Sequence, residues 1–473
     1  MRLLLLFAAC LFAGTASAAQ VLPPEIESAL AAARLPQDAV TLVVADVDPS
    51  VAPRLVHRPD AVVNPASMAK LATTLAALDL LGPASTWTTQ VLVDGPVVAG
   101  VLQGNLYIKG QGDPKLVLER LWLLLRRVRA QGIDRVAGDI VLDHAAFEVA
   151  PGDPGAFDGE PLRPYNASPD ALLLNFKSVT LGFIPQADGS ARVIADPPLA
   201  GVQWPAAVPL AAGSCGDWRA GLRADFGDPL RPRFTGAYTA ACGERTWPLA
   251  FADPRSYAPR AIAGMWQVVG GTTGGVVRDG VTSPAAVPVA ETVSPSLAEV
   301  VRDVNKFSNN VMAQQLFLTL GLKLRGAGTR EAGRDVIGTW WRERISADVP
   351  TFDNGSGLSR DDRITGGQLV RLLQYGWASP VMPELLASLP VVGTDGTLRT
   401  TRAGATAHLK SGSLRDVWGV AGYVDAPGGR RLVLVAIANH PNASPQPLPG
   451  SAVRTSGMRG VVEALLDWVG RQP

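Results

Sequence analysis

Apolar and polar residues follow different periods in different parts of the chain, and these periods predict its elements. Residues 24–82 predict a helix, two strands and a second helix, since alternation indicates strands and a spacing of three to four residues indicates a helix. The second helix lies in NPASMAKLATTLAALDLLG, residues 64–82, and Gly82-Pro83 ends it. Its apolar positions predict one buried face: Met68, Leu71, Leu75, Leu78 and Leu81.

The pattern changes after about residue 86. Short alternating runs separated by turn residues predict a β-rich region over residues 86–265, interrupted by one helix at Leu116–Gln131. Helical spacing returns from about residue 266. The last predicted elements are two strands and a helix: 420–427, 430–440 and from about Gly457. We therefore expect a mixed α/β domain that the chain begins, leaves for a long β-rich insertion and then completes.

The first residues have the order of a secretory signal peptide. Arg2 precedes a short apolar run, and the small residues Ala16-Ser17-Ala18 then supply a cleavage site. We expect residues 1–18 to be removed and the protein to be exported, because the run is too short for a lasting membrane anchor. A second interpretation makes Cys10 a lipidated residue. We expect no transmembrane segment elsewhere in the sequence.

Chain length and net charge limit the classes of protein to which this sequence can belong. The chain has 473 residues, 47% of them hydrophobic, which is too long for a single compact core. Two to four domains are therefore expected. Its 43 basic and 42 acidic residues leave a formal net charge of +1. Because there is no basic excess, nothing favours a nucleic acid or an anionic membrane surface as a partner.

Cysteines and histidines limit the covalent and metal chemistry. Loss of the leader leaves Cys215 and Cys242, and an even pair in an exported protein predicts one disulfide. Two buried free thiols are the alternative. Neither the cysteines nor the four histidines show a metal-binding spacing, so we expect no metal and no cofactor.

Ser67 and Lys70 stand three positions apart at the start of the predicted second helix. Residues i and i+3 share one helix face, so the lysine amine can reach the serine hydroxyl. Serine is a weak nucleophile until a base takes its proton, and lysine is such a base once burial or a neighbouring charge lowers its pKa. The backbone N–H of Ser67, unpaired in a first turn, can also hold an oxyanion. An ordinary surface helix start is the alternative for this motif alone.

Two further motifs follow in an order that suits the same chemistry. Ser308-Asn309-Asn310 lies at a predicted helix junction, and Lys410-Ser411-Gly412 lies at the start of a predicted strand. Ser308 can relay a proton toward a leaving amine, and Asn310 can hydrogen-bond Lys70 and a substrate amide. Lys410 supplies a positive charge for a substrate carboxylate and helps to keep Lys70 neutral. Gly412 lets a substrate backbone approach the strand. A Ser-His-Asp enzyme is disfavoured because the chain has no G-x-S-x-G elbow.

The order S-x-x-K, S-x-N, K-[ST]-G is the signature of penicillin-binding proteins and class A β-lactamases. The chain resembles the low-molecular-mass class C penicillin-binding proteins, peptidase family S13, of the penicillin-binding protein 4 kind. Further matching blocks are LYIKGQGDPKL, YNASPDALLLNF, DNGSGLSRDDRIT and LPVVGTDGTLRTTRAG. Together with the three motifs they span most of the chain after the leader.

This resemblance implies an α+β fold. A β-lactamase/transpeptidase-like serine domain, with an antiparallel sheet flanked by helices, would be split by two inserted β-rich domains. The expected parts of the serine domain are residues 19–85 and 266–473, and the expected insertions are about 86–165 and 166–265.

The resemblance also implies a role for each candidate residue. Ser67 would be the acylated nucleophile, Lys70 the general base, and Ser308, Asn310 and Lys410 the helpers. The backbone N–H groups of Ser67 and Ser413 would form the oxyanion hole. The substrate would lie along one strand segment: Lys410, Ser411, Gly412 and Ser413. The resemblance further supports a Cys215–Cys242 bridge within the inserted region.

We therefore expect a periplasmic serine-type D-Ala-D-Ala carboxypeptidase and DD-endopeptidase. Its partners would be peptidoglycan stem peptides, with β-lactam antibiotics as covalent inhibitors. Two alternatives stay open: a non-catalytic peptidoglycan-binding envelope protein and a β-lactamase-type hydrolase. The balance of the two peptidase activities, the third stem-peptide residue and the oligomeric state stay open as well.

Four further polar residues stand in these blocks outside the three motifs. Asp113 and Asp353 stand close to glycines, which favours a loop-shaping role over a catalytic one. Tyr165 and Asn166 either approach the site or pin the insertion, and the sequence does not choose between these roles.

Overall fold

The computed structural model describes residues 21–150, 152–402, 404–445 and 456–472. The expected signal peptide at residues 1–18, and Cys10 with it, lies outside the described residues. Within the described part of the chain, no helix is both long and apolar enough to cross a bilayer.

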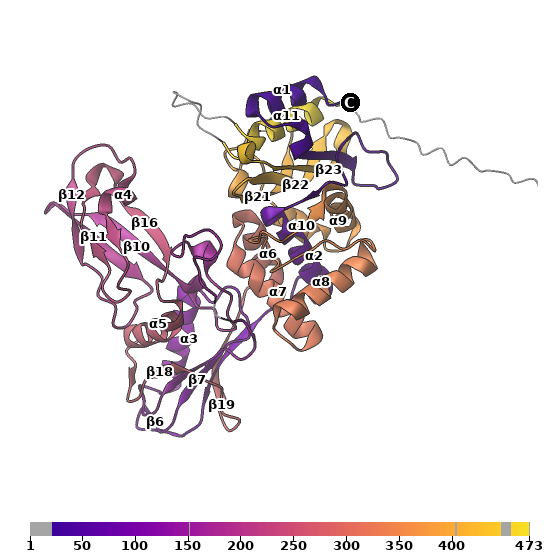
Figure 1. The fold of residues 1–473 in the computed structure, drawn as a ribbon. Helices are drawn as coiled ribbons and strands as arrows, with labels where there is room; N and C mark the ends of the chain where they lie inside the picture. Colours follow the sequence, from indigo (N-terminus) through magenta and orange to yellow (C-terminus); the bar gives the residue numbers. More distant parts are fainter. Residues whose placement is uncertain (1–20, 151, 403, 446–455, 473) are drawn as a thin grey trace, which may run out of the picture.

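A five-stranded antiparallel sheet forms the centre of the main domain (Figure 1). Its strands come from the two ends of the chain, in the order β2 (Leu55–His57), β1 (Val40–Asp46), β23 (Arg430–Asn439), β22 (Val417–Ala426) and β21 (Ala407–Leu414). Nearly every residue of β22 and β23 is buried, because helices cover both faces of the sheet. The predicted strands at 420–427 and 430–440 are therefore confirmed.

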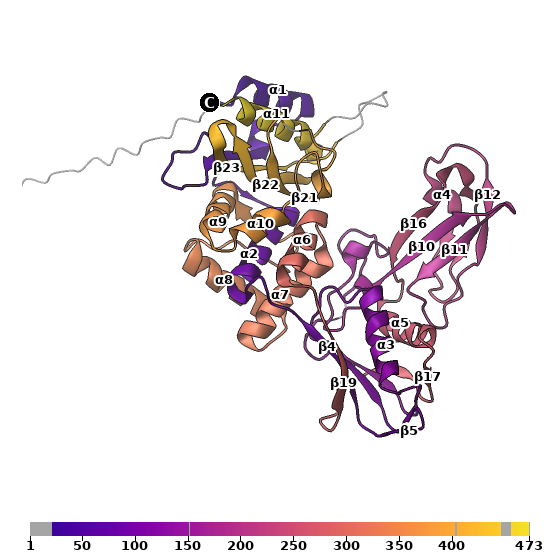
Figure 2. The same cartoon turned by 180° about the vertical axis from the view of Figure 1, so that it is seen from behind.

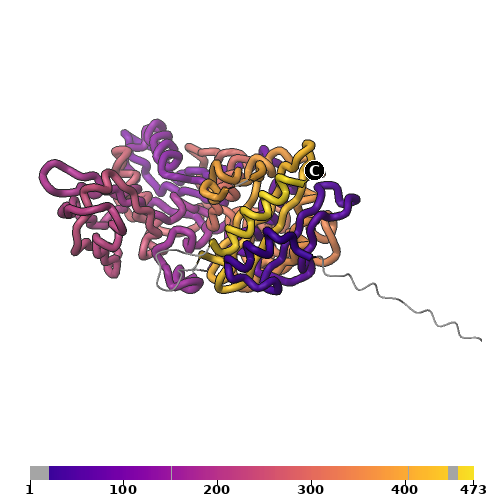
Figure 3. The backbone as a smooth tube through the Cα atoms, turned by 90° about the horizontal axis from the view of Figure 1, so that it is seen from above, coloured from indigo at the N-terminus to yellow at the C-terminus, as the bar shows by residue number. Residues whose placement is uncertain are grey.

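Alternate side chains of β23 enter two separate cores. Leu432 and Leu434 pack with α1 (Pro24–Ala33) and α11 (Met458–Arg471). These two terminal helices lie side by side (Figure 3). Val433 and Val435 face the opposite core, which is built mainly from helices. These helices are α2 (Lys70–Leu81), α6 (Leu297–Phe307), α7 (Asn310–Arg325), α8 (Arg330–Arg344), α9 (Gly366–Ala378) and α10 (Met382–Ser388).

The chain leaves the main domain after α2 and builds two further sheets that lie close together in the first inserted unit. The larger has the order β18 (Val277–Asp279), β9 (Ile140–Asp143), β7 (Leu106–Lys109), β4 (Thr88–Val93) and β19 (Val287–Val293). The smaller has the order β17 (Thr272–Thr273), β8 (Arg135–Val136), β6 (Val101–Leu102) and β5 (Val97–Val98). Helix α3 (Leu118–Ala130) contacts β19, and α5 (Pro254–Val268) contacts β18.

A third inserted sheet comes between the two segments of the first unit in the sequence, and in space it projects away from the main domain (Figures 1 and 2). Its order is β15 (Tyr238–Thr239), β12 (Ala207–Ala211), β11 (Ser190–Asp196), β10 (Ser178–Pro185) and β16 (Arg245–Ala250). A short helix, α4 (Trp218–Leu222), and the hairpin of β13 (Ala224–Asp225) and β14 (Arg233–Phe234) stand beside it.

The strand pairing corrects two expectations about the insertion. Strands β17, β18 and β19 pair with β8, β9 and β4, so residues 272–293 complete the inserted sheets, whereas the sequence placed them in the serine domain from residue 266. The first inserted unit is also discontinuous, not a single block at 86–165. We place the return to the main domain near Leu297, where α6 begins.

Helix α5 was missed in the sequence because of its proline content. It starts at Pro254 and has Pro259 in its interior, a residue that removes a backbone donor and usually ends a helix. Its buried face of Tyr257, Ala261 and Ile262 packs into the core of the inserted region and keeps it helical.

Candidate active site

Ser67 lies in a tight 3-10 turn, Ala66–Ala69, directly before α2. Ala66 has a left-handed φ of 49°, which requires support from its surroundings. Asn64 supplies it: its Oδ1 accepts from Ala66 N at 2.8 Å, and its own backbone N donates to Asn439 Oδ1 at 2.8 Å. The turn that presents Ser67 is therefore fixed to the end of β23.

The Lys70 amine contacts Ser67 inside the protein. Lys70 is 0% exposed, and its Nζ lies 2.9 Å from Ser67 Oγ and 2.7 Å from Asn310 Oδ1. It also donates to the backbone carbonyl of Ser356. A neutral amine has two N–H groups and one lone pair. The Lys70 amine thus has three oxygen neighbours: Asn310 Oδ1, the Ser356 carbonyl and Ser67 Oγ. When the amine is neutral and the first two oxygens accept its N–H groups, its lone pair is left for the Ser67 hydroxyl proton.

The electrostatics favour this neutral amine. Burial and the charge of Lys410 hold the pKa of Lys70 well below its usual value, while Asp362 opposes them. Asp362 is itself fully buried, and burial raises the pKa of its carboxyl to about 7. One of its oxygens accepts from Asp353 N at 2.7 Å.

Ser308 and Asn310 stand at the junction of two helices. Ser308 ends α6 in a left-handed conformation with φ 56°, and α7 begins at Asn310. Between them, Asn309 caps α7 by accepting from Met312 N at 3.0 Å. This break in the helical path turns the Ser308 hydroxyl toward Lys410, whose Nζ lies 2.9 Å away.

Strand β21 brings the third motif against the Ser67 turn. Lys410 is fully buried, and burial lowers the pKa of its amine to about 7. A Cβ added to Gly412 would lie 2.7 Å from Pro65 O and 3.1 Å from Ser67 N. Only glycine allows this approach. Ser411 Oγ lies 2.6 Å from Thr397 Oγ1, so these two hydroxyls share a hydrogen bond.

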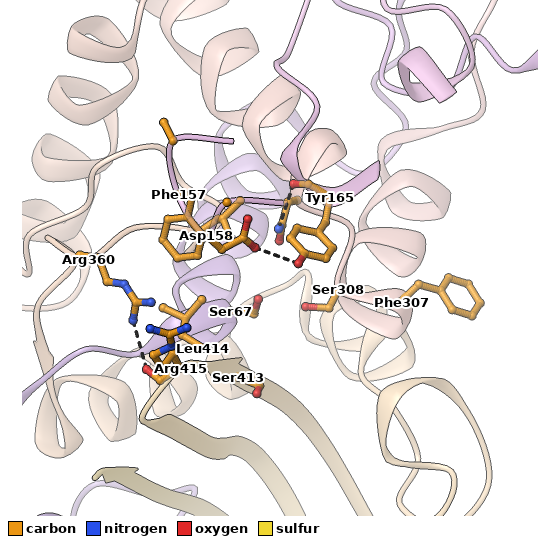
Figure 4. Close-up of a pocket in the computed structure, with 14 residues that line it drawn as sticks. Ser67, Phe157, Asp158, Tyr165, Phe307, Ser308, Arg360, Ser413, Leu414 and Arg415 are labelled. Carbon is orange, nitrogen blue, oxygen red and sulfur yellow. Dashed lines mark hydrogen bonds between the residues drawn. The ribbon is translucent and has the colours of Figure 1, made fainter. Parts of the chain in front are cut away.

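Ser67 opens into two cavities. The larger, about 570 Å³, also has Ser308, Asn310 and Ser413 in its wall, with Tyr165 and Arg360 opposite (Figure 4). The smaller, about 220 Å³, lies along β21 and is lined by Ser67, Ser308, Thr397, Leu398, Ser411, Ser413, Trp418 and Arg459. A substrate that follows β21 would thus pass the Ser67 hydroxyl.

The inserted chain contributes one wall of the larger cavity. Tyr165 donates its hydroxyl to Asp158 at 2.8 Å, and its carbonyl accepts from Asn310 Nδ2 at 3.3 Å. Asn166 fixes the same loop by donating to Asp158 Oδ1 at 2.8 Å. The open question about these residues is thus answered: Tyr165 lines the site, and Asn166 holds the loop that carries Asp158.

The two aspartates singled out in the sequence have separate structural tasks. Asp113 pairs with Arg120 at 2.7 Å and accepts from Lys115 N at 2.8 Å, so it shapes its loop as expected. Asp353 faces Arg334 at 3.5 Å. The structure also joins Cys215 and Cys242 in a disulfide within the inserted region.

Several residues around Ser67 were not identified from the sequence: Asn64, Asn439, Asp158, Ser356, Arg360, Asp362 and Arg415. A signal for some of them was present in Gly355-Ser356-Gly357 of the DNGSG block. A Cβ at Gly357 would lie 1.9 Å from Ala66 O, so this loop reaches the Ser67 turn only because it is glycine-rich.

Comparisons with known proteins identify the family. The model described as the D-Ala-D-Ala carboxypeptidase 3 (S13) family matches residues 22–453. The chain belongs to this family. The resemblance inferred from the three motifs is thereby confirmed, and this S13 peptidase is a serine hydrolase of the D-Ala-D-Ala carboxypeptidase class.

Individual relatives and structures agree with this assignment. The chain is 29% identical to a D-alanyl-D-alanine carboxypeptidase of Actinomadura sp. (strain R39), over 81% of this chain and 74% of that protein. It is 24% identical to the D-alanyl-D-alanine carboxypeptidase DacB of Haemophilus influenzae, over 79% and 80%. The crystal structure of penicillin binding protein 4 (dacB) from Haemophilus influenzae aligns with a TM-score of 0.75 at 20% identity, covering 94% and 99% of the two chains. The expected fold class is therefore confirmed.

Proposed function

We propose that this peptidase removes the terminal D-Ala from peptidoglycan stem peptides through an acyl-enzyme on Ser67. The observation that carries the proposal is the buried Lys70 amine, whose Nζ lies 2.9 Å from Ser67 Oγ and also contacts Asn310 Oδ1 and the Ser356 carbonyl. A neutral amine can give its two N–H groups to those two acceptors and use its lone pair to take the Ser67 proton. That arrangement provides a nucleophile with its base already in contact.

The proposed acylation uses the geometry of the three motifs. Ser67 Oγ attacks the carbonyl carbon of the penultimate D-Ala while Lys70 takes the hydroxyl proton. The backbone N–H groups of Ser67 and Ser413 hold the developing oxyanion. When the C–N bond breaks, the proton passes to the leaving amine through Ser308. Free D-Ala departs, and water then hydrolyses the ester to regenerate Ser67.

Lys410 selects substrates that end in a carboxylate. In the free protein burial lowers the pKa of its amine to about 7. A carboxylate placed beside it favours the charged form, so substrate binding and protonation of Lys410 support each other. The same charge disfavours protonation of Lys70, which keeps the base ready.

The same site suits cleavage of a second kind of peptide bond and acylation by an inhibitor. The D-Ala to diaminopimelate crosslink presents the same acyl group with a larger leaving amine, so we include endopeptidase activity in the proposal. The cavity of about 570 Å³ beside Ser67 has room for that larger group. Penicillins, which carry an activated carbonyl and a carboxylate, acylate Ser67 and leave slowly. We place these reactions in the periplasm.

Digestion of purified muropeptides tests the proposal. We expect the monomeric pentapeptide to lose D-Ala and the crosslinked dimer to yield monomers, with both activities absent in Ser67→Ala. A folded wild-type protein that binds muropeptides without cleaving them would support the non-catalytic alternative. Rapid steady turnover of penicillin, in place of a long-lived adduct, would support the β-lactamase alternative.

A further inference from the structure

A second open groove lies on the inserted region, beyond the wall of the catalytic cavity. It has a volume of about 670 Å³ and is formed by three segments: the loop 160–165, the α4 region with Arg219, Arg223 and Phe226, and strand β16 with Trp247. We call it the outer groove. None of the chemistry proposed above uses it.

The outer groove adjoins the catalytic cavity at one residue. Tyr165 lines both spaces, and it is 40% exposed. The short turn Pro164–Asn166 that carries it contacts α7 of the main domain and β16 of the third sheet. Figure 2 shows β16 and the third sheet on the side of the molecule away from α8. Tyr165 is therefore the place where a ligand that extends from Ser67 would meet the outer groove.

Trp247 forms a fixed aromatic surface in this groove. Its ring makes edge-on contacts with Trp218 at 6.1 Å and with Phe226 at 5.8 Å between centroids, and the residue is only partly buried. The disulfide joins Cys215 and Cys242, which precede Trp218 and Trp247 in the chain, so it ties together the two segments that carry these rings. Aromatic rings held in this way offer a flat apolar face to a ligand.

Two guanidinium groups flank that surface without an acidic partner. The Arg219 guanidinium lies over the Trp218 ring, 5.0 Å from its centroid, and over the Trp247 ring at 5.9 Å, and Arg223 also lines the groove. Among the described residues neither side chain has a carboxylate within ion-pair distance, whereas Arg163 on the opposite wall pairs with Glu160 at 3.4 Å. Free guanidinium donors beside an aromatic face suit a ligand that has apolar C–H faces together with many oxygen acceptors.

We propose that the outer groove binds the disaccharide end of the muropeptide whose peptide end occupies the catalytic cavity. This inference rests on the proposed function. One pyranose face stacks on Trp247, and Arg219 and Arg223 donate to the hydroxyl, acetamido or carboxyl oxygens of the sugars and their lactyl-peptide link. One substrate molecule would occupy both spaces with the four residues between the sugar and the scissile bond, about 13 Å when extended, running past Tyr165.

The test compares a disaccharide pentapeptide with the same pentapeptide lacking sugars. The variant Arg219→Ser/Arg223→Asn removes both donors and leaves the aromatic rings in place, and asparagine tolerates the left-handed φ of 46° at position 223. We expect its KM for the disaccharide pentapeptide to rise about fivefold to tenfold, a loss at the low end for two hydrogen bonds because the groove is open to water. The KM for the sugar-free peptide and both kcat values should stay at wild-type levels. Arg192→Ser, an exposed arginine on β11 outside the groove, is the matched control.

A binding measurement separates this inference from the proposed function. In Ser67→Ala protein, calorimetry with the disaccharide tetrapeptide reports binding without turnover. We expect binding that is weakened about fivefold to tenfold when Arg219→Ser/Arg223→Asn is added. Equal KM shifts for both pentapeptides, or disaccharide binding unaffected by the double change, would overturn the inference. Loss of cleavage in the wild-type protein would instead overturn the proposed function, and the binding result would still decide the groove.

Discussion

At the scale of residues, the protonation state of Lys70 determines what the site can do. A charged lysine needs three acceptors and gives Ser67 no base, whereas a neutral one donates twice and accepts once. Asn310 Oδ1 and the Ser356 carbonyl can accept the two N–H groups of a neutral amine, Ser67 Oγ is the third oxygen in contact, and the amine is shielded from water. The buried charge of Lys410 adds repulsion that favours the same neutral form.

The first prediction concerns this base. Lys70→Met keeps a long side chain in the buried space but removes the amine, so acylation by a fluorescent penicillin should slow by about 100-fold or more. Stopped-flow fluorescence measures the rate. Lys323→Met, on an exposed position of α7, is the control and should acylate like the wild type. A Lys70→Met protein that acylates at the wild-type rate would remove the base from the mechanism.

Sequence motifs identified some site residues and missed others for a physical reason. Ser67, Lys70, Ser308, Asn310 and Lys410 lie in short fixed spacings that can be read directly. Asp362 and the Ser356 carbonyl affect Lys70 only because the chain folds back and brings residues 353–365 close to its amine. No local spacing encodes such an approach, although the glycines at 355 and 357 indicate that some close contact is present.

At the scale of elements, the site depends on how closely strand β21 passes the Ser67 turn. Lys410, Ser411, Gly412 and Ser413 pair along their length with β22. On the other edge of the strand, the backbone bonds to residues 390–392 involve only its first residues, 407–409. On the other side Gly412 packs against Pro65 O and Ser67 N. The strand and the turn therefore set the width of the substrate channel together.

A substitution at Gly412 tests that width. In Gly412→Ala the new Cβ would lie 2.7 Å from Pro65 O, so β21 or the Ser67 turn must move by several tenths of an ångström. We expect acylation to fall by about tenfold or more, because misplacement of this size weakens a preorganised site. Circular dichroism should show an unchanged fold. Gly182→Ala on β10, where the nearest atom is 3.8 Å away, is the control, and an equal loss there would contradict the explanation.

Element prediction succeeded where periodicity was long and failed where tertiary contacts overrode it. The two buried strands near the C-terminal end and α2 were predicted because their apolar positions form extended patterns. Helix α5 and strands β17 and β18 were not, since the helix contains Pro259 and the strands are two and three residues long. Such short strands exist only because a neighbouring strand supplies their hydrogen bonds.

At the scale of the whole molecule, the inserted region is tied to the main domain at defined points. The turn Pro164–Asn166 contacts α7, and Gln315 of α7 accepts from Asp170 N at 2.9 Å. Asp170 in turn holds His144 Nδ1 at 2.5 Å and Lys177 Nζ at 2.9 Å. His144 also faces Asp279 at 3.3 Å. These contacts hold the wall that carries Tyr165 over Ser67.

The His144 cluster should make stability depend on pH. Burial lowers the pKa of His144, but the hydrogen bonds and charges of Asp170 and Asp279 outweigh burial and raise this pKa to about 9. Lys177 is a second cation that pairs with Asp170. The stabilisation is complete below the unfolded pKa of about 6.5 and is lost as the pH rises through about 9. His144→Gln should therefore lower the free energy of unfolding at pH 6 by at most about 3 kcal/mol, and by little at pH 10.

Urea unfolding at both pH values measures this difference. The double variant His144→Gln/Asp170→Asn completes a cycle that isolates the coupling between the two residues. A destabilisation by His144→Gln that is the same at pH 6 and pH 10 would show that the ion pair contributes nothing and that only packing is lost.

The most direct test of the central claim is the position of the penicillin adduct. The account predicts that mass spectrometry of a proteolytic digest finds one penicilloyl group, on the peptide that contains Ser67, and that Ser67→Ala protein with an unchanged circular dichroism spectrum carries none. An adduct on another residue, or a folded wild-type protein that carries no adduct after prolonged exposure, would contradict the assignment of Ser67 as the nucleophile.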